Sequence, residues 1–180
     1  TSFEERKRFG IPGLDEALDG GIPKGHIVLI SGTTGSGKSL SGMQFLEEGI
    51  RKGEKAVFVA LEEPVQQIKK TAEVHGWNLD EHEERDELRF VTAELIDPMP
   101  DELLSNIVEA VEEIGAGRLV FDSISSLMSA TMHQEQVRQF LLQLANYIKY
   151  KGLTGIFSYL MSSNFGADKD QLLGALETNN

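Results

Sequence analysis

Residues 32–39 have the types and spacing of a phosphate-binding loop, because they read Gly-Thr-Thr-Gly-Ser-Gly-Lys-Ser and match the pattern G-x-x-x-x-G-K-[ST]. Glycines at these positions let backbone N–H groups turn toward phosphate oxygens at the positive end of the following helix. The amine of Lys38 would reach the terminal phosphates, and the hydroxyl of Ser39 would ligate magnesium. A flexible Gly-Ser turn is the alternative, which the flanking strand and helix patterns disfavour. The predicted contacts come from Thr33, Thr34, Gly35, Ser36, Gly37, Lys38, Ser39 and Leu40.

Three acidic residues follow apolar runs and could complete such a site. Asp122 ends the run Leu-Val-Phe-Asp and would hold magnesium through water or Ser39. Glu62 and Glu63 follow another run, where a carboxylate could orient or deprotonate a water molecule. Neighbouring residues of an extended strand point to opposite faces, so we expect one of the pair to aim at the phosphates, Glu62 first and Glu63 close behind. Alternatively, the pair complements the dipole of a helix that begins near Pro64.

The spacing of apolar residues indicates the elements that position these side chains. Short runs rich in Val, Ile and Phe predict buried strands at residues 26–31, 55–60, 87–92, 118–122 and 154–160. Helical patterns between them end at Gly53, Gly76, Gly115 and Gly152. We expect an exposed connection at the acidic run of residues 80–87, and a loop after the fourth strand at residues 123–134. The alternation predicts an α/β fold with a mostly parallel central sheet, helices on both faces, and a ligand beyond the carboxyl ends of the strands.

Composition narrows the class of protein. The 180 residues predict one domain over residues 1–180, and 40% hydrophobic with 26% charged residues is ordinary for a globular protein. The absence of cysteine excludes zinc ribbons and thiol catalysis. No apolar stretch approaches the roughly 20 residues of a membrane-spanning helix. We therefore expect a cytoplasmic protein that does not contact a membrane.

The distribution of charge argues against extended nucleic-acid binding. The net charge is −12; residues 1–90 hold 12 basic and 17 acidic side chains, and residues 91–180 hold 5 and 12. A nucleic-acid surface needs a basic stripe, which the second half lacks. The one basic cluster, Arg6-Lys7-Arg8, is predicted to be a solvated arm.

Taken together, the motifs resemble a known family. The segments Gly-Ile-Pro-Gly-Leu-Asp-Glu-Ala-Leu at residues 10–18 and Gly-Gly-Ile-Pro-Lys-Gly at residues 20–25 precede the phosphate loop. With the Glu pair and Phe-Asp-Ser-Ile at residues 121–124, they are similar to the KaiC-like branch of the RecA-type ATPases, from about residue 8 to residue 160.

This resemblance implies a three-layer P-loop (RecA-like) fold, with ATP and Mg²⁺ as cofactors. It also implies a homo-oligomer, commonly a hexameric ring, with ATP at subunit interfaces. It assigns nucleotide and magnesium binding to Gly35, Gly37, Lys38 and Ser39, and it makes Asp122 the acid of the second magnesium motif. The catalytic residues that it implies are Glu62 and Glu63, together with Lys38.

The resemblance weakens toward the end of the sequence. Family members continue beyond the fifth strand with further strands, whose basic residues reach a neighbouring subunit's ATP, whereas residues 161–180 hold Lys169 as their one cation. We therefore expect these strands to be missing or altered, and hydrolysis to be slow. The predicted function is a magnesium-dependent, slowly hydrolysing ATPase with a regulatory or signalling role. A non-hydrolysing nucleotide-sensing scaffold is the main alternative, and a recombinase-like single-stranded DNA-binding ATPase is a weaker one.

Overall fold

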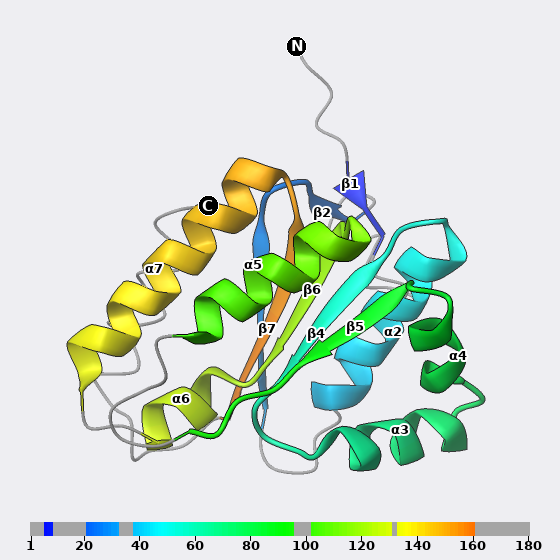
Figure 1. Ribbon diagram of the computed structural model, residues 1–180, viewed down its shortest axis with the longest axis horizontal. Coiled ribbons are helices and arrows are strands. Elements are labelled where there is room, and N and C mark those ends of the chain that lie inside the picture. The colour runs from blue at the N-terminus through cyan, green and yellow to red at the C-terminus, as the bar shows by residue number, and fades with distance from the viewer. Residues whose placement is uncertain (1–5, 9–20, 33–37, 96–101, 131–132, 161–180) are drawn as a thin grey trace.

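The apolar runs form one parallel sheet. The computed structural model describes residues 6–8, 21–32, 38–95, 102–130 and 133–160. All five predicted strands are present and lie in the order β3-β7-β6-β4-β5 (Figure 1). They are β3 (Ile27–Gly32), β4 (Ala56–Ala60), β5 (Leu88–Val91), β6 (Arg118–Asp122) and β7 (Thr154–Leu160).

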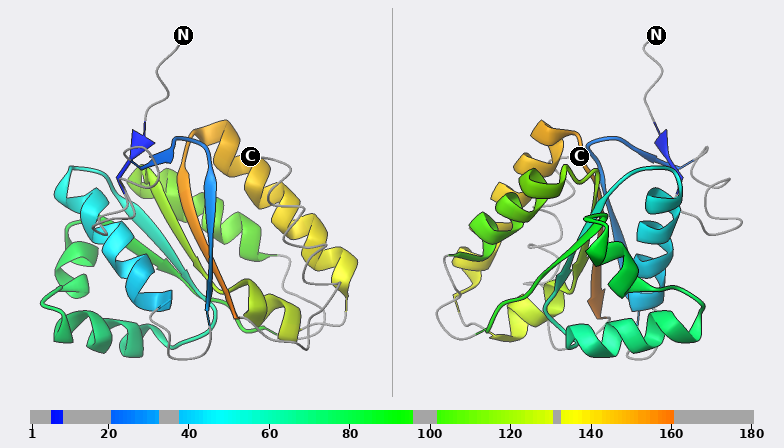
Figure 2. Two further views of the ribbon diagram at one scale, coloured as in Figure 1. Left: turned by 180° about the vertical axis from the view of Figure 1, so that it is seen from behind. Right: turned by 45° about the vertical axis from the view of Figure 1, so that its right-hand side comes forward.

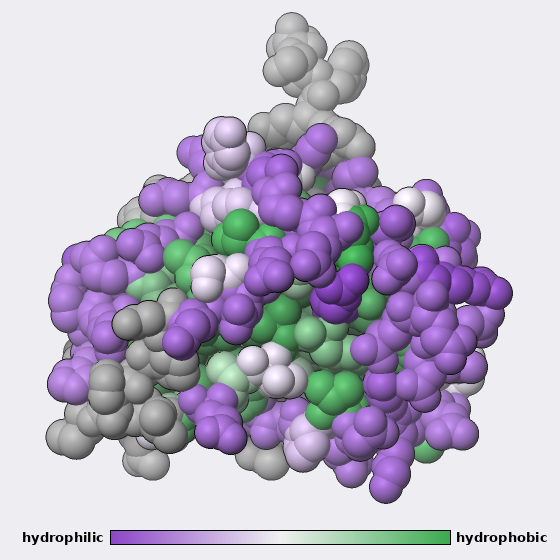
Figure 3. All heavy atoms as spheres, viewed as in Figure 1, coloured by the Kyte–Doolittle hydropathy of each residue, from purple (hydrophilic) through white to green (hydrophobic). Residues whose placement is uncertain are grey.

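Helices cover both faces of this sheet (Figures 1 and 2), which confirms the predicted α/β architecture. One face carries α5 (Glu102–Ile114), α6 (Ile124–Ala130) and α7 (Gln134–Lys151). The opposite face carries α2 (Lys38–Arg51), α3 (Val65–Val74) and α4 (Leu79–Glu84). Strand residues alternate between the two hydrophobic clusters, so that Val57 packs on the α5 side and Phe58 on the α2 side. Figure 3 shows hydrophilic residues around the α5 face and hydrophobic residues gathered at its centre.

Helix ends fall where the glycines predict them. Gly152 follows α7 with φ of 71°, a left-handed conformation that glycine adopts without a steric penalty. The N–H of Leu153 then donates to the carbonyl oxygen of Ile148 at 2.9 Å, which satisfies a carbonyl at the helix end. The other predicted stops, Gly53, Gly76 and Gly115, also have positive φ.

Two predicted connections are helical, and both predictions were therefore wrong. Residues 80–87 were expected to be an exposed connection, but most of this run belongs to α4. The side chain of Asn78 caps this helix by accepting a hydrogen bond from the N–H of Glu81 at 3.1 Å. Lys69 of α3 then holds it through Asp80 and Glu83, at 2.6 and 2.5 Å. These contacts stabilise a helix whose acidic sequence has little hydrophobic periodicity.

The segment after β6 gives the second correction. Residues 123–134 were expected to be a connection, yet α6 occupies residues 124–130. Ile124, Leu127 and Met128 recur at helical spacing and are buried against the α5 side of the sheet. No helix within the described segments combines the length and hydrophobicity needed to cross a lipid bilayer.

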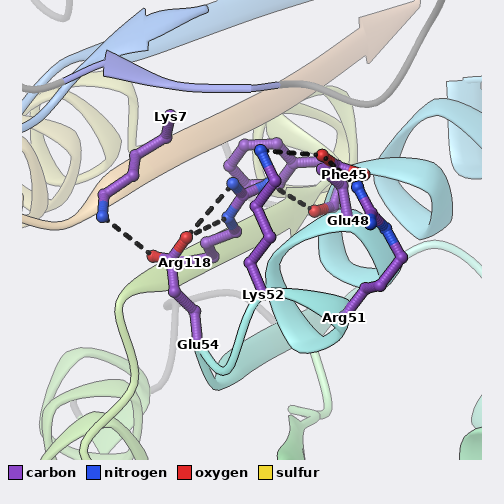
Figure 4. A network of polar contacts seen from close by, with 7 residues as sticks. All are labelled: Lys7, Phe45, Glu48, Arg51, Lys52, Glu54 and Arg118. Atoms are coloured by element: carbon purple, nitrogen blue, oxygen red, sulfur yellow. Dashed lines mark hydrogen bonds and ion pairs between the residues drawn. The ribbon is translucent and has the colours of Figure 1, made fainter.

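The basic cluster near the start of the chain is not a solvated arm. Arg6 and Lys7 form the short strand β1 (Arg6–Lys7), which pairs antiparallel with β2 (Ile22–Pro23). Arg6 donates to the carbonyl oxygen of Gly21 at 3.1 Å, and Lys7 lies 3.7 Å from the carboxylate of Glu54 (Figure 4). Residues 10–18, which carry much of the family resemblance, lie outside the described segments.

Candidate functional site

The first turn of α2 is held close to the carboxyl end of β6. Gly42 faces Val120, and a Cβ atom at Gly42 would lie only 2.8 Å from Val120 Cγ1. The buried side chains of Met43, Phe45 and Leu46 hold the helix against the sheet. This close approach requires a residue without a side chain at position 42, and it brings Ser39 to the end of the strand.

Ser39 joins two of the predicted acidic residues. Its hydroxyl donates to Asp122 Oδ2 at 3.0 Å, and Glu63 Oε1 lies 3.5 Å from the same Oγ atom. The three residues come from α2, from the end of β6 and from the segment after β4. Parallel strands end at the same edge of a sheet, so three distant parts of the sequence meet there.

Asp122 is the most constrained member of the site. Its residue is 2% exposed, and its carbonyl oxygen accepts the N–H of Leu61 at 2.7 Å, which ties the end of β6 to the residue before the Glu pair. Its Oδ1 atom accepts a hydrogen bond from the Ser158 hydroxyl at 2.6 Å. Sequence reasoning missed Ser158. The available signal was its place near the end of a predicted strand, which is also where Asp122 lies.

The described residues include some of the predicted contacts and not others. Leu40 is half-buried in the first turn of α2. Glu63 is half-buried beside Ser39, and Glu62 is exposed. The backbone of Lys38 begins α2, while its side chain and the whole of Thr33, Thr34, Gly35, Ser36 and Gly37 lie outside the described part of the chain.

The oxygen donors of the site suit magnesium held together with a phosphate ligand. Ser39 offers a hydroxyl, and Asp122 and Glu63 offer carboxylates, which are the donors that Mg²⁺ prefers. Among the described residues, no three acidic or histidine side chains are arranged to hold a metal ion by themselves. Mg²⁺ is usually bound by one or two protein oxygens together with substrate phosphates and water, so this donor set fits.

The fold and site define a class of protein: a parallel α/β protein whose phosphate-loop motif lies between β3 and α2, with an acid at the end of another strand of the sheet. The family model described as "ATPase: KaiC" matches residues 8–172. This chain belongs to the KaiC ATPase family.

Individual relatives agree with this assignment. The circadian clock protein KaiC3 of Synechocystis is 34% identical over 178 residues, which cover 92% of this chain and 35% of KaiC3. A UPF0273 protein of Thermotoga maritima is 36% identical over 168 residues, covering 85% of this chain and 69% of that protein. This chain therefore spans about a third of KaiC3 and about two thirds of the shorter relative.

A solved structure confirms the fold. The crystal structure of a KaiC-like protein from Pyrococcus horikoshii superimposes with a TM-score of 0.83 at 31% identity, covering 98% of this chain and 78% of that chain. The predicted RecA-type, KaiC-like fold is thus confirmed.

Proposed function

We propose that this protein binds ATP with Mg²⁺ at the carboxyl edge of its sheet and hydrolyses it slowly. The observation that carries the proposal is the contact between Ser39 and Asp122, at 3.0 Å. It joins the last residue of the phosphate-loop pattern to the acid of the second magnesium motif. Membership of an ATPase family supports the same reading.

Each predicted site residue has a separate role in the proposed hydrolysis of ATP. Lys38 would neutralise charge on the terminal phosphates, and Ser39 with Asp122 would hold the cation. Bound Mg²⁺ withdraws charge from the phosphate oxygens. Glu62, or its neighbour Glu63, would orient the attacking water and accept its proton. We retain Glu62 as the first candidate, because Glu63 already points toward Ser39.

The positions of the basic side chains support slow hydrolysis of ATP. Phosphoryl transfer is accelerated by roughly 10³ to 10⁵ when an arginine reaches the transferred group. Residues 91–180 hold 5 basic side chains, and three of them are engaged in ion pairs away from the site. Arg118 pairs with Glu54, Arg138 with Glu135, and Lys151 with Glu112.

We further propose a cytoplasmic protein of one domain over residues 1–180 that assembles into a homo-oligomer, with ATP at the subunit interfaces and a regulatory role. The hydrophobic centre of the α5 face is consistent with assembly (Figure 3). The acidic second half disfavours nucleic acid as the partner.

Calorimetry with ATP, with and without Mg²⁺, tests the binding proposal. Wild-type protein should bind ATP, and Lys38→Ala should lose that binding. Asp122→Asn should lose the increase in ATP affinity that Mg²⁺ gives to the wild-type protein. Absence of ATP binding by folded wild-type protein would refute the proposal.

Phosphate release and light scattering separate the ATPase from the alternative of a non-hydrolysing scaffold. An ATPase releases phosphate, and that release should stop when Glu62 and Glu63 are both changed to Gln. Assembly that depends on ATP without phosphate release would establish the scaffold. A monomer that hydrolyses ATP would remove the oligomer from the proposal.

A further inference from the structure

Ser158 of β7 lies beside Asp122 of β6 because of the register between the two strands. Phe121 pairs with Phe157, and their rings stack at a centroid distance of 4.8 Å on the α5 side of the sheet. Successive side chains of a strand point to opposite faces. The next residue of each strand, Asp122 on one and Ser158 on the other, therefore faces α2 and its first turn.

The Ser158 hydroxyl has two acceptors within reach and one proton to donate. Asp122 Oδ1 lies 2.6 Å away, whereas the carbonyl oxygen of Phe121 lies 3.4 Å away. Hydrogen bonds to a carboxylate are shorter and stronger than those to a neutral carbonyl, so the Ser158 hydroxyl donates its hydrogen bond to Asp122. Ser158 is 6% exposed, which limits competition from water.

Each carboxylate oxygen of Asp122 therefore accepts one hydrogen bond from a serine hydroxyl. Oδ1 accepts from Ser158 on one side, and Oδ2 accepts from Ser39 on the other, at 3.0 Å. Two hydrogen bonds to the two oxygens of a planar group fix the rotation of that plane. The Ser39 hydroxyl donates a hydrogen bond to Oδ2, so the lone pairs of its oxygen remain available to a cation.

We propose that Ser158 is a positioning residue, which holds the Asp122 carboxylate in the plane that presents Oδ2 to Ser39 and to the cation of a bound nucleotide. This inference rests on the proposed binding of ATP with Mg²⁺. Ser158 touches neither phosphate nor water in this role, and it acts through Asp122. Residues that orient metal ligands typically change metal affinity about 10- to 100-fold when they are removed.

The test compares Ser158→Thr with Ser158→Val, which have nearly the same shape and differ in the hydroxyl. Mn²⁺, a paramagnetic substitute for Mg²⁺, is titrated into the protein–ADP complex and followed by electron paramagnetic resonance. Thr should bind Mn²⁺ within about 3-fold of wild type, and Val about 10-fold more weakly. ADP binding in the presence of EDTA should be equal in the two variants, because that measurement excludes the metal.

Two further experiments test the role of Ser158, and a third variant replaces Ser158→Val if that protein does not fold. In an Asp122→Ala background, Thr and Val at position 158 should bind Mn²⁺ equally, and a persistent difference would overturn the role through Asp122. If the added methyl group prevents folding, Ser158→Ala compared with wild type serves instead. In the metal-free crystal structure of Ser158→Ala, the carboxylate should turn away from Ser39, and an unchanged orientation would overturn the proposal.

Different results would overturn the role of Ser158 and the proposed metal site. Equal Mn²⁺ affinity in the Thr and Val variants would overturn the role of Ser158 alone and leave nucleotide binding intact. A wild-type protein that binds ADP but no Mn²⁺ would overturn both this role and the proposed metal site.

Discussion

The guanidinium of Arg118 lies over the ring of Phe45, 4.6 Å from its centroid, and donates a hydrogen bond to the carbonyl oxygen of the same residue at 2.7 Å. Arg118 is 1% exposed, and Glu54 lies 3.2 Å from its guanidinium (Figure 4). A buried cation is tolerated when it is paired and hydrogen-bonded. This arrangement ties the first residue of β6 to the middle of α2, while Asp122 and Ser39 join the other end of the strand to the start of the helix.

Gly49 leaves the space that Arg118 occupies, and Gly49→Ala should destabilise the protein. A Cβ atom at position 49 would lie 2.4 Å from Arg118 Cδ, which forces the side chain or the helix to move. We expect a loss of about 1–3 kcal/mol in the free energy of unfolding, measured with urea. In an Arg118→Val background the same change should cost less than half as much, because the space is empty; an equal cost would contradict the explanation.

Glu48 should contribute a stability that depends on pH. Burial raises the pKa of Glu48, but hydrogen bonds from Arg51 and Lys52 lower that pKa by more, so it lies below the ordinary value of 4.5. The contribution is therefore fully present above pH 4.5 and is lost as the pH falls through the lower pKa of the folded protein.

Comparing wild type with Glu48→Gln tests this expectation. At pH 7 the variant should be less stable by up to about 1 kcal/mol, because pairs near the surface contribute little. Urea unfolding of both proteins between neutral and acid pH should show the difference shrinking below pH 4.5. A difference that stays constant over this range would show that charge is not its source.

The two glutamates after β4 should have separable effects on ATP turnover. Glu62→Gln should reduce phosphate release about 10²- to 10⁴-fold with ATP affinity unchanged, as expected for loss of a general base. Glu63→Gln should raise the Mg²⁺ concentration needed for half-maximal rate, because Glu63 lies 3.5 Å from Ser39. Steady-state kinetics at varied Mg²⁺ checks both. If Glu63→Gln alone abolishes turnover, Glu63 is the base.

Phe121 should contribute to stability through its ring contacts, because it packs between Phe157 and Phe140, with centroid distances of 4.8 and 6.0 Å. Phe121→Leu should cost about 1–3 kcal/mol, part of it from the lost ring pairs. A double-mutant cycle with Phe157→Leu, followed by thermal and urea unfolding, should show a coupling of about 0.5–1.5 kcal/mol. Additive losses would mean that the stacking adds nothing beyond burial.

Much of this architecture was predictable because its signals are local. Runs such as Ala-Val-Phe-Val-Ala at residues 56–60 can be buried only as strands between two layers, and glycines end the helices that cross between them. The Asn78 cap, three residues before Glu81, was a local signal for the start of the helix α4. This helix was missed partly because Lys69, which pairs with Asp80 and Glu83, is contributed by another helix. The paired strand at Arg6 and Lys7 was missed for a similar reason, since its partner lies 15 or more residues later.

For the site, the sequence alone predicted the chemistry: a phosphate loop ending in Ser39, an acid at the end of a strand, and a pair of glutamates. Only the tertiary structure decided which hydroxyl groups donate hydrogen bonds to the Asp122 carboxylate. Ser158 is 36 residues from Asp122 and 2.6 Å from its carboxylate, because the order β7-β6-β4 makes their strands neighbours. A motif records residue types along the chain, whereas hydrogen bonding depends on strand order and register, which are set by packing of the whole sheet.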